Sequence, residues 1–122
     1  MSKTILVVDD DRLVVELARR TLEQHGYDVF TAGNGEEALK ALATKIPDLI
    51  ILDVQMPDMN GYTFIVEKNK MPQYFNIPVV MLTASSEMGP LFKRHGVKGY
   101  LIKPFKLQEL FDKVAEIVGP PA

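Results

Sequence analysis

The sequence predicts an α/β fold in which a central parallel sheet is covered by helices on both faces. Short apolar runs alternate along the chain with segments of helical periodicity, which is the rhythm of repeated βα units. Three of these runs are apolar at every position, as in strands that are buried on both faces. The connections between them are short, as right-handed crossovers in one compact domain require.

Length and composition narrow the classes of protein to consider. At 122 residues the chain has the size of one ordinary domain, and we expect a single domain over residues 1–122. The net charge of −2 argues against nucleic acid as a direct partner. The absence of cysteine excludes disulfides and thiolate metal sites. The first apolar run is too short for a signal peptide or a membrane span, so we expect a cytoplasmic protein with no membrane partner.

The expected strands are the five apolar runs. They are Ile5-Leu6-Val7-Val8, Val29-Phe30, Leu49-Ile50-Ile51-Leu52, Val79-Val80-Met81-Leu82 and Tyr100-Leu101-Ile102. The sheet that they form should be central and buried.

Capping residues and apolar spacing mark the first expected helix. Asp11 is suited to cap a helix that carries Leu13, Leu17 and Leu22 along one side. Gly26 should end this helix, because glycine adopts the left-handed conformation without a steric penalty.

Two further helices are marked in the same way. Asn34 and Glu37 have the spacing of a capping box before an apolar stretch. The last helix is expected to end at Gly119-Pro120-Pro121. Its apolar positions, at steps of three and four residues, are Leu107, Leu110, Phe111, Val114 and Ile117.

The residues that close the apolar runs carry the chemistry of this sequence. In an open parallel sheet, ligands bind beyond the carboxyl ends of the strands. The first run ends in Asp9-Asp10-Asp11 and the third ends in Asp53. The fourth ends in Thr83 and the fifth in Lys103-Pro104. The fold should therefore bring carboxylates, a hydroxyl and an ammonium group to one edge of the sheet.

A divalent cation would resolve the repulsion within this group. Asp9, Asp10 and Asp53 would raise one another's proton affinity unless a cation lies among them. Magnesium takes oxygen ligands, one or two carboxylates among them, and completes its octahedron with water and phosphate. The simpler interpretation is that Asp10 and Asp11 only cap a helix. It explains Asp53 less well, because a carboxylate that closes a buried strand needs a partner.

Lys103 is the expected partner of Asp53. Its charge would also neutralise a phosphoryl group in transfer. The bond to Pro104 adopts the cis form far more readily than other peptide bonds, and a cis bond here would aim the lysine back across the strand ends.

Four motifs along the chain suggest a family. They are Val8-Asp9-Asp10-Asp11, the stretch from Leu52-Asp53 to Asn60-Gly61, Thr83-Ala84 and Lys103-Pro104-Phe105. In this order and at nearly this spacing they resemble the receiver domains of response regulators in two-component systems. The resemblance covers essentially the whole chain. It implies a doubly wound, flavodoxin-like or CheY-like sheet of five parallel strands in the order 2-1-3-4-5, with five helices.

The resemblance also implies roles for the acidic residues. Asp53 resembles the phosphoacceptor of the family and one of its metal ligands. Asp10 resembles the direct ligand of Mg²⁺, with the backbone carbonyl of Gln55 as a further ligand. Asp9 resembles the neighbour that holds the metal directly or through water.

Five other positions match the family in the same way. Thr83 corresponds to the hydroxyl that bonds a phosphoryl oxygen, and Lys103 to the lysine that neutralises the transferred group. Tyr100 resembles the aromatic residue that turns inward on activation. Gln55 and Ser85 resemble the variable positions that tune the rate of dephosphorylation.

The implied function is that of a signalling phosphoacceptor. A histidine kinase or phosphotransfer protein would pass a phosphoryl group to Asp53 with Mg²⁺ as the cofactor. A downstream protein target would then recognise the changed surface of the last strand and helix. The chain would assist its own phosphorylation and dephosphorylation, and we do not expect an enzyme that turns over a separate substrate.

Three other classes of protein are weighed against this one. A flavodoxin is disfavoured because Asp9-Asp10-Asp11 would place carboxylates where a flavin phosphate needs amide groups. Phosphatases of the haloacid dehalogenase type use Asp-x-Asp, whereas this chain has Asp53-Val54-Gln55, and an amide cannot shuttle the proton. A pseudo-receiver, which keeps the fold as an interaction module without phosphorylation, is the remaining alternative.

The region before the last strand departs from the family pattern. Thr83 and Lys103 are 20 positions apart, which is shorter than usual and leaves only Pro90–His95 for the fourth helix. We expect Ser85–Gly89 to be mobile until phosphate or a partner orders it. Val97-Lys98-Gly99, just before the last strand, lacks the paired acidic residues of dimerising regulators. We therefore expect a monomer with and without phosphorylation.

Overall fold

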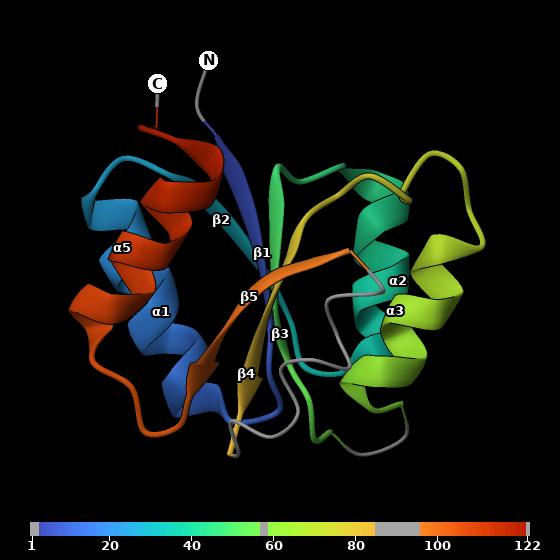
Figure 1. Ribbon diagram of the computed structural model, residues 1–122, viewed down its shortest axis with the longest axis horizontal. Coiled ribbons are helices and arrows are strands. Elements are labelled where there is room, and N and C mark those ends of the chain that lie inside the picture. The colour runs from blue at the N-terminus through green and yellow to red at the C-terminus, as the bar shows by residue number, and fades with distance from the viewer. Residues whose placement is uncertain (1–2, 57–58, 85–95, 122) are drawn as a thin grey trace.

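A computed structural model describes residues 3–56, 59–84 and 96–121 of the chain. Strands and helices alternate through most of this length (Figure 1). In chain order they are β1 (Thr4–Val8), α1 (Arg12–Gln24), β2 (Asp28–Ala32), α2 (Gly35–Thr44), β3 (Leu49–Asp53), α3 (Gly61–Asn69), β4 (Val79–Thr83), β5 (Val97–Ile102) and α5 (Leu107–Val118).

The five strands form one parallel sheet in the order β2-β1-β3-β4-β5. Every residue of β1, β3 and β4 is buried, whereas β2 and β5 at the edges are partly exposed. The predicted class of fold and the strand order that the resemblance implies are confirmed.

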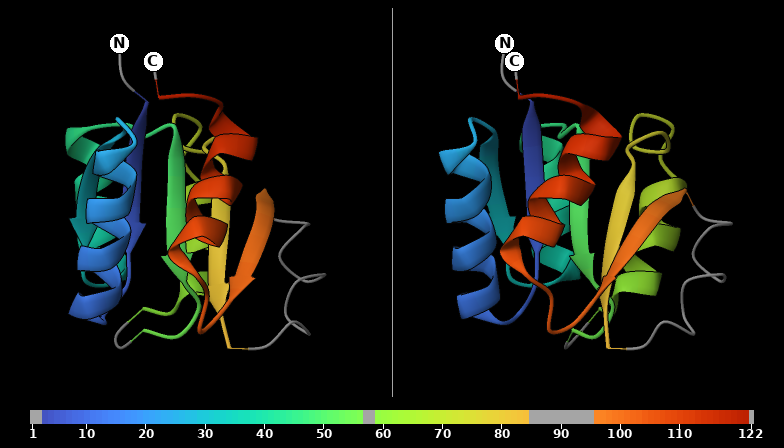
Figure 2. Two further views of the ribbon diagram at one scale, coloured as in Figure 1. Left: turned by 90° about the vertical axis from the view of Figure 1, so that its left-hand side faces the viewer. Right: turned by 60° about the vertical axis from the view of Figure 1, so that its left-hand side comes forward.

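Helices cover both faces of the sheet (Figure 2). α1 and α5 lie side by side on one face, and α2 and α3 lie on the other (Figure 1). Each face has its own apolar cluster, because alternate strand residues point to opposite sides. Leu6, Ile50 and Met81 belong to the α2 and α3 side, whereas Val7 and Leu82 belong to the α1 and α5 side.

The predicted caps at the starts of α1 and α2 are confirmed. The Asp11 side chain accepts a hydrogen bond from the Leu13 amide and caps α1, and Gly26 follows this helix with φ of 98°. The Asn34 side chain caps α2 by accepting from the Glu37 amide. The Glu37 carboxylate accepts a hydrogen bond from the amide of Gly33, one residue before the cap, and not from the amide of Asn34 as in the predicted capping box.

The expected packing side of α1 is wrong. Leu13 and Leu17 are 66% and 41% exposed, and only Leu22 of the three predicted leucines is buried. Ala18 joins Leu22 in the core, and Val14 and Val15 pack against it from partly buried positions. This helix therefore has two apolar strips, a buried one and an exposed one, and the spacing of its leucines does not show which strip is buried.

The last strand is longer than predicted. Val97-Lys98-Gly99 belongs to β5 and does not precede it. Its pairing with β4 is irregular, since Val97 pairs with Val79 and Gly99 pairs with Val80, which leaves Lys98 between the two pairs. Such an extra residue is typical of an edge strand.

Four helices are present among the described residues, against the five expected. The shortened fourth helix expected at Pro90–His95 and the mobile segment expected at Ser85–Gly89 both lie outside the described residues. Within the described part of the chain, no helix is long and apolar enough to span a membrane.

The two ends of the described chain meet at the amino edge of the sheet. The Lys3 amide donates a 2.7 Å hydrogen bond to the carbonyl oxygen of Pro121, and the Tyr27 hydroxyl donates one of the same length to that of Gly119. The carboxyl ends of all the strands lie at the opposite edge (Figure 1).

Candidate functional site

The carboxyl edge of the sheet holds a polar cavity of about 330 Å³. Its walls come from the segments that follow β1, β3, β4 and β5, which are distant in sequence and adjacent in the sheet. The lining residues are Asp9, Asp10, Asp11, Asp53, Val54, Gln55, Thr83, Ala84 and Lys103. The predicted gathering of strand-end residues at one edge is therefore confirmed.

Three carboxylates converge in this cavity. Oxygens of Asp9, Asp10 and Asp53 all lie within 4.8 Å of one another. Asp9 is 1% exposed and Asp53 is 6% exposed, whereas Asp10 is open to solvent. Burial of a carboxylate without full hydration is unfavourable, so the two inner residues depend on nearby positive charge.

Burial changes the acidity of Asp53. The pKa of this carboxyl is raised from 3.8 to about 6, with burial as the largest cause and the negative charge of Asp9 acting in the same direction. The Lys103 ammonium and the amide of Gln55 oppose the rise. Asp53 is thus mostly ionised at neutral pH, in a place where its charge is poorly solvated.

Lys103 bridges the two buried carboxylates. Its Nζ lies 2.8 Å from Oδ2 of Asp9 and 3.5 Å from Oδ1 of Asp53. Burial lowers the pKa of Lys103, but the hydrogen bond to Asp9 and the charges of both carboxylates outweigh burial and raise it overall. The peptide bond to Pro104 is cis, and the Lys103 amide donates to the carbonyl oxygen of Thr83. The sequence predicts Asp53 as the partner of this lysine, yet Asp9 is the nearer one.

The three aspartates after β1 differ in what they contact. Asp9 accepts the Asp11 amide on Oδ1 and Lys103 on Oδ2, so both of its oxygens are in use. Asp11 caps α1. The Asp10 carboxylate makes no hydrogen bond or ion pair within the part of the chain that the structure describes. Helix capping therefore explains Asp11 and does not explain Asp10.

The remaining predicted residues fall into three groups. Thr83 is buried at the end of β4 and lines the cavity with the exposed Gln55. Tyr100 is half-buried on β5, opposite Met81, and packs against the apolar cluster under α2 and α3 without lining the cavity. Ser85 lies outside the described residues.

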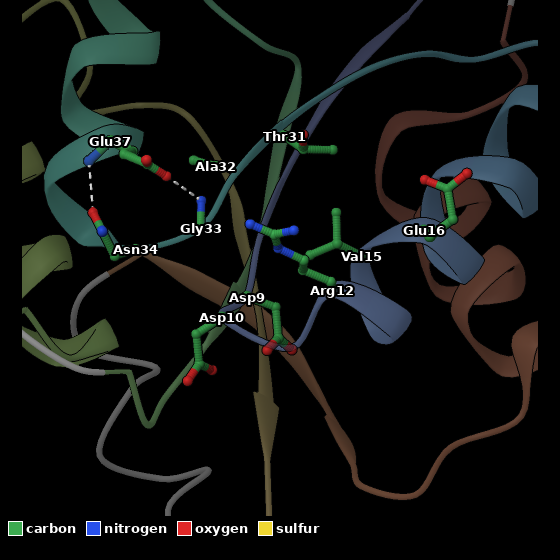
Figure 3. A pocket seen from close by; sticks show the side chains of 10 residues that line it. All are labelled: Asp9, Asp10, Arg12, Val15, Glu16, Thr31, Ala32, Gly33, Asn34 and Glu37. Atoms are coloured by element: carbon green, nitrogen blue, oxygen red, sulfur yellow. Dashed lines mark hydrogen bonds between the residues drawn. The ribbon is translucent and has the colours of Figure 1, made fainter.

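A second polar cavity of about 510 Å³ shares Asp9 and Asp10 with the first and extends over the end of β2 (Figure 3). Arg12 and Glu16 of α1 line one part of it, and the start of α2 lines another. Its carboxylates outnumber its single guanidinium group, so it favours cations over anions. No sequence pattern marks this cavity.

An apolar groove of about 360 Å³ lies on the other side of Lys103. It runs between α1 and the segment that joins β5 to α5. Its lining residues are Val14, Leu17, Lys103, Pro104, Phe105 and Leu107. The sequence does not reveal this surface, because it assigns Leu17 to the same packed strip as Leu22.

The chemistry of the first cavity fits a hard divalent cation. Its donor atoms are oxygens, its three carboxylates converge to within 4.8 Å of one another, and that of Asp10 faces solvent. Asp10, Asp53 and the backbone carbonyl of Gln55 are the groups that would hold Mg²⁺, and Asp9, whose oxygens also accept from Asp11 and Lys103, lies beside them.

The fold and the site together define a class of signalling domain. A 2-1-3-4-5 sheet with an acidic cluster, a hydroxyl and a lysine at its carboxyl edge is what the resemblance to response regulators implies. The family model described as the response regulator receiver domain matches residues 5–115. The chain belongs to this family.

Known proteins of the family are similar over nearly the whole chain. The alkaline phosphatase synthesis transcriptional regulatory protein PhoP of Bacillus subtilis is 43% identical over 120 residues, which are 97% of this chain and 49% of that protein. The response regulator MprA of Mycobacterium ulcerans is 38% identical, with 97% and 51% covered. The chain therefore spans about half the length of these relatives.

Solved structures give the same result. The chemotaxis response regulator CheY4 of Vibrio cholerae superposes with a TM-score of 0.90 at 34% identity, and the match covers 96% of this chain and 99% of that one. The signal receiver domain of a histidine kinase from Syntrophus aciditrophicus has a TM-score of 0.83 at 33% identity, with 96% and 90% covered. Receivers thus occur among these neighbours both in regulators and in a kinase.

Proposed function

We propose that the chain accepts a phosphoryl group on Asp53 from a histidine kinase or phosphotransfer protein, with Mg²⁺ as the cofactor, and signals through its altered surface. One observation carries this proposal. The buried carboxylate of Asp53 lies 3.5 Å from the Lys103 ammonium and within 4.8 Å of the carboxylate oxygens of Asp9 and Asp10. Such a group is suited to attack phosphorus between positive charges.

The transfer is an in-line displacement. One oxygen of ionised Asp53 attacks the phosphorus of the phosphohistidine, the P–N bond breaks, and the imidazole leaves with the electron pair of that bond. A bound Mg²⁺ supplies charge that offsets the developing negative charge on the phosphoryl oxygens. Among the residues of the chain, Lys103 supplies positive charge that offsets the negative charge of the phosphoryl group. The Thr83 hydroxyl donates a hydrogen bond to a phosphoryl oxygen.

Loss of the signal follows from the same chemistry. The acyl phosphate on Asp53 is attacked by water at phosphorus, which returns the carboxylate and releases inorganic phosphate. Gln55, which is exposed at the cavity, and Ser85 are the residues proposed to set the access of that water. The chain limits the lifetime of its own phosphorylated state and turns over no separate substrate.

The phosphodonor is proposed to dock on the apolar groove beside Lys103. Leu17 and Leu107 expose apolar surface there, next to the cavity that holds Asp53. A helix that presents a phosphohistidine can cover this groove while its imidazole reaches the cavity.

The downstream target is proposed to contact β5 and α5, where Tyr100 responds to a shift of Thr83 towards the phosphoryl group. We propose a cytoplasmic monomer with no direct contact to nucleic acid or membrane.

The proposal is tested by incubating the protein with acetyl phosphate and Mg²⁺ and measuring its intact mass. Wild-type protein should gain one phosphoryl group, and no gain is expected with EDTA or in the Asp53→Asn variant. A pseudo-receiver would show no phosphoryl adduct in any arm.

A further inference from the structure

The glycine that begins α3 lies directly against the main chain of Asp53. Gly61 is buried, and its amide donates a 2.8 Å hydrogen bond to the carbonyl oxygen of Val54. A β-carbon on Gly61 would lie 2.5 Å from the carbonyl oxygen of Asp53 and 3.0 Å from Cα of Val54. Ordinary contacts of a β-carbon begin at 3.4 Å, so only hydrogen fits at this position.

Hydrogen bonds to β4 prevent the main chain of Asp53 and Val54 from shifting away from Gly61. The Val54 amide donates a 3.0 Å hydrogen bond to the carbonyl oxygen of Leu82, and Asp53 pairs with Leu82 in the register of β3 and β4. The turn from Asp53 to Gln55 is thus held between β4 and the first residue of α3. In a close-packed interior, bulk added on one side must move this turn.

We propose that Gly61 is a positioning residue for cation binding and phosphoryl transfer. The absence of a side chain sets where Asp53 and the main chain of Gln55 stand relative to Asp9 and Asp10. An alanine methyl group would have to move the Asp53 carbonyl by 3.4 − 2.5 = 0.9 Å to reach ordinary contact. A misplacement of about 1 Å can cost about 100-fold in rate. This inference rests on the proposed function.

The chain contains a matched position at the start of α2. Gly35 is also buried and also follows an asparagine cap, and each asparagine accepts a 2.8 Å hydrogen bond from the third residue of its helix. A β-carbon on Gly35 would lie 2.8 Å from the Met59 side chain and meets no main-chain atom among its three nearest neighbours. A methionine has rotatable bonds and can yield, whereas the Asp53 carbonyl cannot.

The experiment compares Mg²⁺ binding by calorimetry in metal-free wild-type, Gly61→Ala and Gly35→Ala proteins, after unfolding curves have shown that each is folded. Gly61→Ala should bind Mg²⁺ at least about 10-fold more weakly and react with acetyl phosphate at least about 10-fold more slowly. Gly35→Ala should stay within about twofold of wild type on both measures. In metal-free protein, the amide chemical shifts of Val54 and Gln55 should differ from those of wild type in Gly61→Ala and match them in Gly35→Ala.

A second pair of variants, Asn60→Ala and Asn34→Ala, tests the inference if Gly61→Ala does not fold. Asn60→Ala removes the cap that fixes the first turn of α3 without adding bulk, and it should weaken Mg²⁺ binding about threefold. Asn34→Ala removes the equivalent cap of α2 and should leave Mg²⁺ binding at the wild-type level. Wild-type affinity in folded Gly61→Ala or in Asn60→Ala, or an equal loss in the α2 counterpart, would overturn the inference. A wild-type protein that binds no Mg²⁺ would contradict the proposed function itself, and the inference would fall with it.

Discussion

Neighbouring aspartates at the end of β1 have separate tasks. Asp9 is buried and fixed from two sides, by the amide of Asp11 and by the ammonium of Lys103. It therefore orients the lysine that faces Asp53. Asp10 is exposed and makes no such contact within the described residues, which leaves its carboxylate available to a cation. Asp11 stabilises the start of α1.

Substitution of Asp10 and of Asp11 should separate metal binding from stability. Asp10→Ala should remove most Mg²⁺ binding and leave the metal-free free energy of unfolding nearly unchanged, because among the described residues it breaks no hydrogen bond or ion pair. Asp11→Ala should lower the free energy of unfolding by about 1 kcal/mol through loss of the cap and should retain Mg²⁺ binding. Calorimetric titration and urea unfolding measure the two quantities. Full Mg²⁺ affinity in Asp10→Ala would refute the assignment.

The raised pKa of Asp53 predicts how stability depends on pH. The folded state holds this proton up to about pH 6, whereas the unfolded chain releases it near 3.8. The stability that the protonated form contributes is therefore complete below 3.8 and is lost as the pH rises through 6. At pH 7 without metal, Asp53→Asn should be more stable than wild type by about 1 to 3 kcal/mol, at about 1.4 kcal/mol for each unit of pKa.

Urea unfolding in EDTA between pH 5 and pH 7.5 measures this difference. The advantage of Asp53→Asn should grow from pH 5 to about pH 6.5, level off above that, and shrink when Mg²⁺ is added to both proteins. An advantage that does not change with pH would show that the Asp53 carboxyl titrates normally. Phe64 is fully buried and has no titratable group, so a Phe64→Leu variant should differ from wild type by an amount that does not depend on pH.

Among the elements, α1 shows why apolar spacing alone is ambiguous. Ala18 and Leu22 face the core, whereas Leu13 and Leu17 are exposed, and Leu17 lies beside the residues that follow β5. Both strips satisfy helical periodicity, and only the position of α5 and the sheet decides between them. The outward strip borders the cavity that holds Asp53, since Lys103 lines both the cavity and the groove.

The groove on α1 should matter for a protein phosphodonor and not for a small one. Leu17→Ala should lower kcat/KM for transfer from a phosphorylated histidine kinase about 10-fold, which corresponds to about 1.4 kcal/mol of lost contact. The rate with acetyl phosphate should not change. Ile46→Ala is the matched control, because Ile46 is 56% exposed in the connection at the amino end of β3, away from the site.

Stopped-flow or quench-flow measurement of phosphoryl transfer gives these rates. If Leu17→Ala lowered kcat/KM equally with both donors, Leu17 would affect the phosphoryl transfer step and not the docking of the kinase. An equal effect of Ile46→Ala would show that the groove has no special role.

Buried strands were more predictable than buried polar side chains. The central runs are apolar at every position, so their burial and the edge at which they end follow from composition. Lys68 of α3 shows the opposite case. It is fully buried, donates to the carbonyl oxygen of Phe75 and the side chain of Asn69, and has its pKa lowered by burial to about 8. No pattern in the sequence distinguishes it from an exposed lysine.

At the scale of the whole molecule, parallel topology explains why the candidate site could be predicted. Every strand of a parallel sheet ends at the same edge, so the residues after each apolar run must meet there. The nearer pairing of Lys103 with Asp9, and the groove beside it, depend on side-chain packing between distant segments and do not follow from strand order. The close approach of Gly61 to Asp53 is of the same kind.

The assembly state is a prediction for the whole chain. Because Val97-Lys98-Gly99 carries no acidic residue, the edge strand β5 lacks one half of a salt-bridged dimer face. Light scattering with and without beryllofluoride, a stable phosphoryl mimic, should give the monomer mass in both conditions. A dimer that forms only with beryllofluoride would contradict this expectation.

The identity of the residue that accepts the phosphoryl group tests the account most directly. Protein treated with acetyl phosphate and Mg²⁺ is reduced with borohydride, which converts an acyl phosphate to an alcohol, and peptides are then sequenced by mass spectrometry. Homoserine is expected at position 53 in the peptide that contains Leu52 and Val54, and unmodified aspartate at positions 9, 10 and 11. Reduction at any of those three positions, or a phosphoryl group that survives borohydride on another side chain, would contradict this assignment.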